Sequence, residues 1–105
     1  MSTLDDIPMS ERPHYVYRIY DADDRLIYIG CARSVTTRLA LHTAPSSRSR
    51  ASWGIRRRMA RHTVEEHPNR AAARAAESAA IRAEQPELNV LHNATRRVAR
   101  ERATP

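Results

Sequence analysis

Two short runs of strand-forming residues flank a polar break near the start of the chain. Residues 15–20 and 26–30 are rich in tyrosine, isoleucine and valine, and three aspartates lie in the break between them. Aromatic and β-branched residues on both sides of a polar turn are typical of a β-hairpin. The pattern therefore predicts two antiparallel strands joined by a loop.

The register of this hairpin decides whether Tyr17 and Tyr28 share a face of the sheet. A four-residue loop that pairs Tyr20 with Arg25 places Tyr17 directly opposite Tyr28, and a two-residue loop gives the same pairing. A three-residue loop would place the two tyrosines on opposite faces. The break contains no glycine, which tight hairpin turns favour, so the four-residue loop is expected.

Helical signals follow the hairpin. Ser34 is a favourable N-cap, and in the helix after it Arg38 and His42, four residues apart, lie on one face. A second helix is expected over residues 52–60, with Trp53 as its only large anchor.

The longest helix is expected over residues 70–84, where alanine dominates and helix propensity is high. Pro86 ends this helix, and residues 95–102 predict a further short basic helix. Three apolar residues after the long helix are expected to return to the core, namely Leu88, Val90 and Leu91.

Composition indicates one small basic domain. All 18 basic residues are arginines, against 12 acidic residues, which gives a net charge of +6. Arginine binds phosphate in a bidentate manner, so a nucleic-acid partner is expected; a GC-rich genome, in which arginine replaces lysine, explains the same bias. Leucine, isoleucine, valine and phenylalanine make up only 17 of 105 residues, so the core must be small. We expect a folded domain over residues 14–92, between a flexible segment, 1–13, and a basic tail or short helix, 93–105.

Cysteine usage and hydropathy exclude several classes of protein. The single cysteine, Cys31, excludes an internal disulfide and a cysteine-rich zinc site. No apolar run is long enough to span a membrane or to act as a signal peptide. No membrane association and a cytoplasmic location are therefore expected.

The two predicted strands carry a pair of half-motifs. Tyr15-Val16-Tyr17 and the intact Tyr28-Ile29-Gly30 resemble the Gly-Ile-Tyr and Tyr-Ile-Gly half-motifs of the GIY-YIG nuclease family. The likeness spans residues 14–91. Over residues 15–38 the chain is especially similar to the N-terminal nuclease module of the bacterial excision-repair protein UvrC.

Further motifs follow in the order of that family. The family's helical arginine matches Arg38, and the histidine or tyrosine one turn later matches His42. Its metal-binding glutamate matches Glu77, and its Pro-x-Leu-Asn ending matches residues 86–89, which places its asparagine at Asn89. Order and spacing together are more specific than any one motif.

Two positions depart from the family pattern. The glycine of the first half-motif is Tyr15, which relatives with a looser motif tolerate. A lysine often found just after the second half-motif is Cys31, so one phosphate-contacting charge is absent from that position.

The resemblance implies an α/β (α+β) fold, in which a small three-stranded antiparallel sheet is flanked by helices. Residues 61–66 then form the third strand, for which the sequence alone gives a poor signal. The resemblance also implies an endonuclease that hydrolyses DNA phosphodiester bonds with one Mg²⁺ or Mn²⁺ ion, held by Glu77. In that mechanism Tyr17 takes the proton of the attacking water, Tyr28 positions the water or the phosphate, and Arg38 stabilises the phosphoryl group, while His42 and Asn89 support the site.

Each of these residues also has a purely structural interpretation. Tyr17 and Tyr28 suit a sheet face, and most helix glutamates are solvated. Glu77, however, lies among small apolar residues, including Ala73 and Ala80, which leave a carboxylate access to a cleft. The predicted phosphate contacts, which a solvated basic face would explain equally well, are Arg18, Arg33, Arg56, Arg57, Arg58 and Arg61.

Two other functions stay open. The chain is either catalytically inactive and only binds nucleic acid, or it is a nuclease subunit whose protein partner selects the DNA. The substrate class includes branched and damaged DNA, and roles in DNA repair, recombination, restriction or mobile elements all fit. A pure phosphate binder should hold DNA without metal and weaken steeply with salt.

Overall fold

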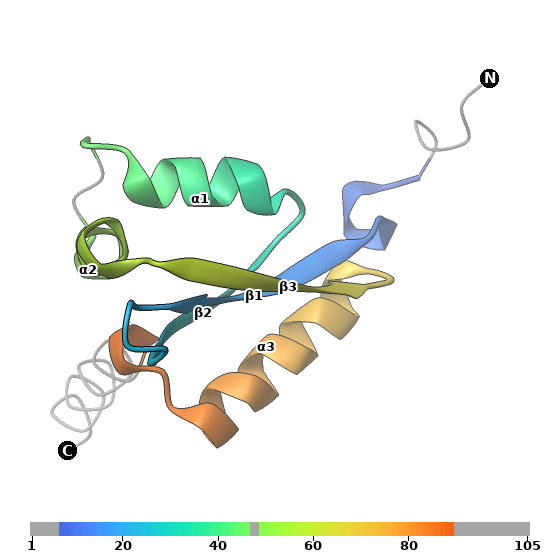
Figure 1. Cartoon of the computed structure of the whole chain (residues 1–105). Helices are drawn as coiled ribbons and strands as arrows, with labels where there is room; N and C mark the ends of the chain where they lie inside the picture. The colour runs from blue at the N-terminus through green and yellow to red at the C-terminus, as the bar shows by residue number, and fades with distance from the viewer. Residues whose placement is uncertain (1–6, 47–48, 90–105) are drawn as a thin grey trace, which may run out of the picture.

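The structure is a computed structural model that describes residues 7–46 and 49–89 (Figure 1). Its centre is a three-stranded antiparallel sheet with strand order β2-β1-β3. Helices α1 and α2 cover one face and α3 covers the other. The predicted α+β class is confirmed. In chain order the elements are a 3₁₀ turn η2 (Met9–Glu11), β1 (His14–Tyr20), β2 (Leu26–Ala32), α1 (Val35–Thr43), α2 (Arg50–Arg58), β3 (Arg61–His67) and α3 (Arg70–Glu84).

The hairpin forms as predicted, but its predicted register is wrong by two residues. Tyr17 pairs with Gly30, and Ile19 pairs with Tyr28. An irregularity between Ile19 and Tyr20 shifts the pairing, because the extra residue of a bulge faces no partner. Side chains alternate along a strand, so a shift of two residues keeps Tyr17 and Tyr28 on one face, with their ring centroids 6.1 Å apart.

The loop between β1 and β2 is longer than expected because aspartate chemistry shapes it. The Asp21 carboxylate accepts hydrogen bonds from the backbone N–H groups of Asp23 and Arg25, at 3.0 and 2.9 Å. Asp24 adopts a left-handed conformation with φ of 66°, which short polar side chains tolerate. These local bonds stabilise a turn that contains no glycine.

Gly30 leaves the space that the Tyr17 ring occupies. A Cβ atom at position 30 would overlap the phenol end of that ring, and Tyr17 is only 1% exposed. The ring cannot move freely because its hydroxyl is hydrogen-bonded to His42. Gly30, from the second half-motif, is therefore needed so that Tyr17, from the first half-motif, can pack against it.

We expect Gly30→Ala to destabilise the domain by about 1–3 kcal/mol, because it overpacks a buried contact. The matched control is Gly54→Ala, at the only other glycine of the chain. There the added methyl group meets the flexible end of Leu88, and alanine restores helix propensity. Urea denaturation measures both variants. Equal stability of the two would contradict this account of Gly30.

The first two helices begin at serine caps. α1 begins after Ser34, whose side chain accepts from the N–H of Thr37, as predicted. α2 begins two residues earlier than predicted, because the N-cap is Ser49, whose side chain accepts from the N–H of Ser52.

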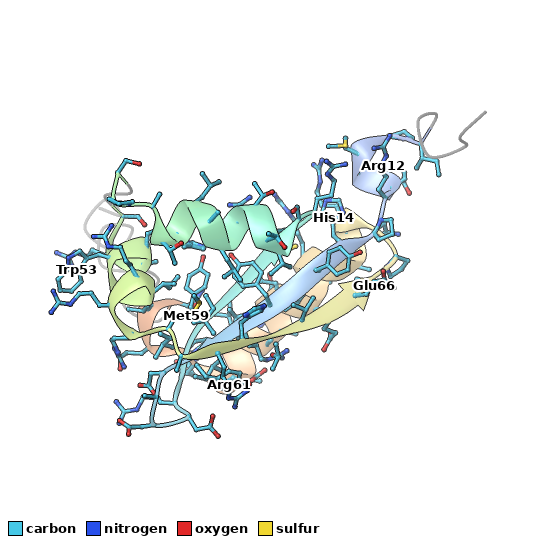
Figure 2. The ribbon with its side chains drawn as sticks, turned by 45° about the horizontal axis from the view of Figure 1, so that its top comes forward. Arg12, His14, Trp53, Met59, Arg61 and Glu66 are labelled. Carbon is cyan, nitrogen blue, oxygen red and sulfur yellow. The ribbon has the colours of Figure 1, made fainter. Side chains whose placement is uncertain are left out.

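The predicted anchor of α2 was also wrong. Trp53 is 54% exposed, and Ile55 is the fully buried residue of this helix. Figure 2 shows Trp53 on the outer side of α2. Ile55 packs with Tyr17, Ile19 and Ile27 in the core between α2 and the sheet.

α3 matches its prediction in both bounds. Asn69 caps its first turn by accepting from the N–H of Ala72 at 2.9 Å. Buried Ala73 and Ala80 pack against Val16 and Ile29 on the second face of the sheet, because alanine lets a helix approach closely. Gln85, with φ of 50°, ends the helix. After it, Leu88 packs against the core between α2 and the sheet, as expected.

The predicted third strand is present as β3, and six of its seven residues are exposed. Within the described ranges, no helix is long and apolar enough to cross a membrane. The predictions for Val90, Leu91, the helix over 95–102 and the tail 93–105 lie outside the described residues.

Candidate active site

A buried hydrogen-bonded chain connects the sheet to both helices of its first face. The Tyr17 Oη atom on β1 lies 3.0 Å from His42 Nε2 on α1. His42 Nδ1 lies 2.9 Å from Ser52 Oγ on α2. All three residues are at most 9% exposed, so water does not screen these bonds.

Tyr28 completes an aromatic cluster around His42. Its ring meets the His42 ring edge-on, with centroids 5.3 Å apart. Burial raises the pKa of Tyr17 well above its ordinary value of 10.0 and also raises the pKa of Tyr28. Both phenols are therefore neutral at pH 7.

His42 is a neutral base in this environment. Burial lowers the pKa of its imidazole below the ordinary value of 6.5, and the nearby Arg38 charge lowers this pKa further. A neutral imidazole has one nitrogen that accepts a hydrogen bond and one that donates. His42 can therefore accept a proton at pH 7.

Glu77 on α3 is a half-buried carboxylate. Burial raises the pKa of Glu77, whereas the charges of Arg74 and Arg38 lower it. Within residues 7–46 and 49–89, no cationic side chain approaches Glu77 closely enough to form a salt bridge. Its charge adds to the pKa rise that burial causes at Tyr28 and Cys31. These two residues lie on opposite faces of β2, and the charge of Glu77 therefore acts on both of these faces.

Arg38 is an exposed cation common to the whole cluster. Burial is the largest cause of the pKa shift at every titratable group of the cluster, and the Arg38 charge is a smaller cause. A positive charge stabilises the deprotonated forms of its neighbours. The groups whose pKa it lowers are Tyr17, Tyr28, Cys31, His42 and Glu77.

Positive charge near Cys31 comes from α3, which the sequence analysis missed. Burial raises the pKa of the Cys31 thiol, and Glu77 raises it further, but Arg74, Arg38 and Arg70 all lower it. Arg70 and Arg74 lie one turn apart on α3. They bring cationic charge close to Cys31, the position at which we expected a phosphate-contacting charge to be absent.

The donor set fits a single hard cation. In the part of the chain that the structure describes, no three His, Cys, Asp or Glu side chains cluster as metal ligands. Mg²⁺ needs only one or two carboxylates, because it keeps several bound waters. A cation at Glu77 would also offset the burial that now raises its pKa. The residues present therefore fit Mg²⁺ or Mn²⁺ and do not fit a closed zinc site.

Asn89 closes the free edge of β2 beside Tyr28. Its Oδ1 accepts from the backbone N–H of Ile29 at 2.8 Å, and its Nδ2 donates to the backbone carbonyl of Ile29 at 3.0 Å. The side-chain amide thereby replaces a neighbouring strand at this residue. The backbone that carries Tyr28 and Gly30 is fixed as a result.

Three of the predicted phosphate-binding arginines are held in ion pairs. Arg18 bonds to Glu84, with its closest contact at 2.7 Å, on the face covered by α3. Arg58 bonds to Asp21 and Glu87. The third is Arg61, which pairs with Asp24 at 2.7 Å and stacks on the Tyr20 ring.

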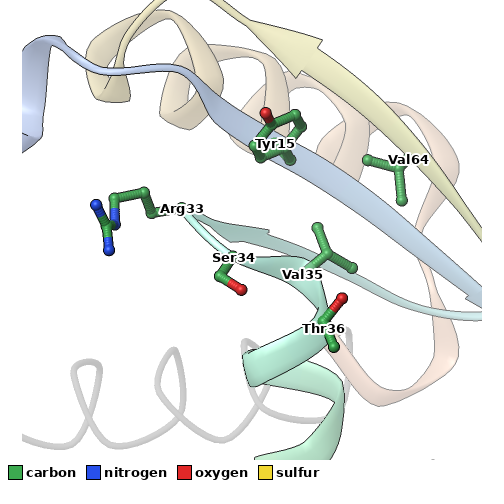
Figure 3. A pocket seen from close by; sticks show the side chains of 6 residues that line it. All are labelled: Tyr15, Arg33, Ser34, Val35, Thr36 and Val64. Atoms are coloured by element: carbon green, nitrogen blue, oxygen red, sulfur yellow. The ribbon is translucent and has the colours of Figure 1, made fainter. Parts of the chain in front are cut away.

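The other three have no carboxylate partner among the described residues. Arg56 donates to the backbone carbonyl of Ala44 at 3.0 Å, and the Arg57 guanidinium lies 4.6 Å from the Trp53 ring centroid. Arg33 borders an open pocket of about 290 Å³ between β1, β3 and the start of α1 (Figure 3). The pocket is lined by Tyr15, Arg33, Ser34, Val35, Thr36 and Val64.

The structure therefore brings Tyr17, Tyr28 and His42 into one cluster, near enough to Arg38 and Glu77 for their charges to act on it, and Asn89 supports the strand that carries Tyr28. Ser52 was not predicted from the sequence, because a contact between residues on two different helices leaves no periodic signal.

The family model of the GIY-YIG catalytic domain matches residues 13–89. No curated protein matches the chain.

Proposed function

The chain belongs to the GIY-YIG catalytic domain family, and from this premise we propose that it is a DNA endonuclease that uses one Mg²⁺ or Mn²⁺ ion. Membership implies nuclease-type function. The observation that carries the finer proposal is that Tyr17, Arg38 and Glu77, from three elements, lie near one another: after burial, the charges of Arg38 and Glu77 act on the pKa of Tyr17, and the charge of Arg38 acts on the pKa of Glu77. The finer likeness to UvrC stays a prediction.

Glu77 would hold the ion in this proposal, with water filling its other positions. A bound divalent ion lowers the pKa of a coordinated water and neutralises charge on phosphate oxygens. The chain's own contribution is a half-buried carboxylate without a competing ion pair in the described ranges. Arg38 supports the same chemistry, since a fixed guanidinium stabilises the charge that builds on the phosphoryl oxygens.

Tyr17 and His42 form the proposed proton path. Tyr17 cannot be an anion at pH 7, because burial raises its pKa. It can accept the proton of the attacking water only if its own hydroxyl proton leaves at the same time. His42 Nε2 is the acceptor, 3.0 Å away. One proton thus reaches Tyr17 Oη, another reaches His42, and Tyr17 stays neutral throughout.

Tyr28 and Asn89 have positioning roles in the proposal. The Tyr28 ring packs against His42 and lies beside Tyr17, where its hydroxyl can orient the water or the phosphate. Asn89 fixes the strand that carries Tyr28 through its two bonds to Ile29.

The direct test is cleavage of a supercoiled plasmid and of a branched DNA. Nicking with Mg²⁺ or Mn²⁺, and none with a chelator, is expected. DNA that binds without being cut with either metal would contradict the proposal and favour the binding module or a subunit that needs a partner. The second of these is distinguished by recovery of cutting when a cell extract is added.

The free arginines of α2 are expected to carry phosphate contacts. The variant Arg56→Gln/Arg57→Gln should reduce the slope of log K against log salt by about 2, since each phosphate contact contributes about 0.9. Trp53 is the only tryptophan and stacks with Arg57, so its fluorescence can follow the titration of the wild type. Fluorescence anisotropy of labelled DNA measures both proteins.

The matched control is Arg18→Gln, which removes an arginine already paired with Glu84. Its salt slope should equal that of the wild type. If the control lost as much slope as the α2 variant, DNA would contact the face covered by α3 instead.

A further inference from the structure

His42 is hydrogen-bonded through both ring nitrogens, and the role of its second partner is unassigned. Ser52, in the first turn of α2, is 4% exposed. Its Oγ lies 2.9 Å from His42 Nδ1. The N–H of Ser52 is held by the N-cap Ser49, so the same turn that begins α2 fixes this hydroxyl against the imidazole.

The proton path requires one particular tautomer of His42. Nε2 must carry the lone pair in order to accept from Tyr17, so the proton of the neutral ring must sit on Nδ1. A buried N–H without an acceptor is costly. The acceptor within reach of Nδ1 is Ser52 Oγ.

The other groups that face His42 do not take this role. Tyr17 on β1 bonds to Nε2, and Tyr28 on β2 meets the imidazole with its ring edge. Arg38, on α1 itself, is a cation that disfavours a protonated ring. Ser52 on α2 is therefore the group whose hydroxyl oxygen can accept from Nδ1–H, the tautomer that the proton path requires.

We propose that Ser52 is a positioning residue that holds His42 as the Nδ1–H tautomer and so leaves Nε2 open to the proton of Tyr17. Its hydroxyl oxygen accepts from Nδ1–H before the transfer. After Nε2 has taken the proton, the same bond stabilises the imidazolium. This inference rests on the proposed function, in which His42 accepts a proton.

The first experiment reads the tautomer directly. Nitrogen-15 chemical shifts of the five histidines are assigned with His42→Gln and measured above the pKa of His42. In the wild type, Nδ1 should be protonated and Nε2 should not. In Ser52→Ala the proton should move to Nε2, whereas Ser52→Thr, which keeps a hydroxyl, should match the wild type. A wild-type proton on Nε2, or an unchanged tautomer in Ser52→Ala, would overturn the proposal.

The second experiment separates positioning from simple packing. Ser52→Ala should lower the rate of metal-dependent cleavage by about 10- to 100-fold, with unchanged DNA affinity, and Ser52→Thr should restore most of it. Cleavage by Ser52→Ala at the wild-type rate at every pH would also overturn the proposal. If the wild type cuts no DNA, the proposed function fails, and the tautomer measurement still decides the role of Ser52. If Ser52→Ala does not fold, the wild-type tautomer alone decides it.

Discussion

Replacing Glu77 with glutamine is expected to abolish metal-dependent cleavage, by at least about 1,000-fold, while DNA still binds. This factor corresponds to about 4 kcal/mol of transition-state stabilisation. Glutamine keeps the shape and polarity of the side chain but removes the negative charge through which Glu77 would hold a divalent cation. Arginine contacts to phosphate are independent of that charge, so affinity for DNA without metal should not fall.

The same substitution should raise stability at neutral pH. Burial raises the pKa of Glu77 in the folded protein above its ordinary value of 4.5, so the charged form is disfavoured by folding. The folded state is therefore destabilised at a pH above the folded pKa, and this effect disappears as the pH falls and the carboxyl group is protonated. Glu77→Gln should have a higher Tm than the wild type at pH 7 and the same Tm near pH 3.

The matched control for both measurements is Glu84→Gln. Glu84 lies on the same helix, but it is paired with Arg18, and this pairing lowers the pKa of its carboxyl group. Glu84→Gln should cut at the wild-type rate and lose stability, the opposite of the result for Glu77→Gln. If Glu77→Gln cuts as fast as the wild type, Glu77 is not the metal ligand.

Local elements were predictable because their signals are local. Ser34 caps α1, and alanine with Asn69 before it and Pro86 after it defines α3. α2 was misplaced because Ser49 and Ser52 are both favourable N-cap residues, and in the structure the cap is Ser49. The hairpin register was wrong because a bulge leaves no pattern in the sequence.

From the sequence, the site could be predicted only where its residues lie at a regular spacing along a single helix or strand, or match a family motif. Arg38 and His42 are four residues apart, which places both on one side of α1, and the family motifs supply Tyr17, Tyr28 and Glu77. The contacts themselves are long-range. Tyr17 meets His42 across 25 residues, and Asn89 meets Ile29 across 60. Ser52 enters the site because α2 packs beside α1, which no periodicity reveals.

Replacing Tyr17 with phenylalanine is the second change with a large expected effect. It removes the hydroxyl that is hydrogen-bonded to His42 Nε2 and that carries the proton in the proposed path, and the ring can still fill the space over Gly30. Loss of a general acid–base group typically lowers a rate by about 100- to 10,000-fold. Because Nε2 then lacks a partner in a buried place, stability should also fall, by about 1–3 kcal/mol.

Cleavage by Tyr17→Phe should be measured where the variant is fully folded, beside Tyr20→Phe from the same strand. Tyr20 stacks with Arg61, away from His42, so its variant should cut normally. In the wild type, the rate should rise with pH through the pKa of His42, which burial lowers below 6.5, because only the neutral ring accepts a proton. This rise should be absent from the residual activity of Tyr17→Phe. A variant that keeps the wild-type rate and the same rise would show that the proton leaves the water by another path.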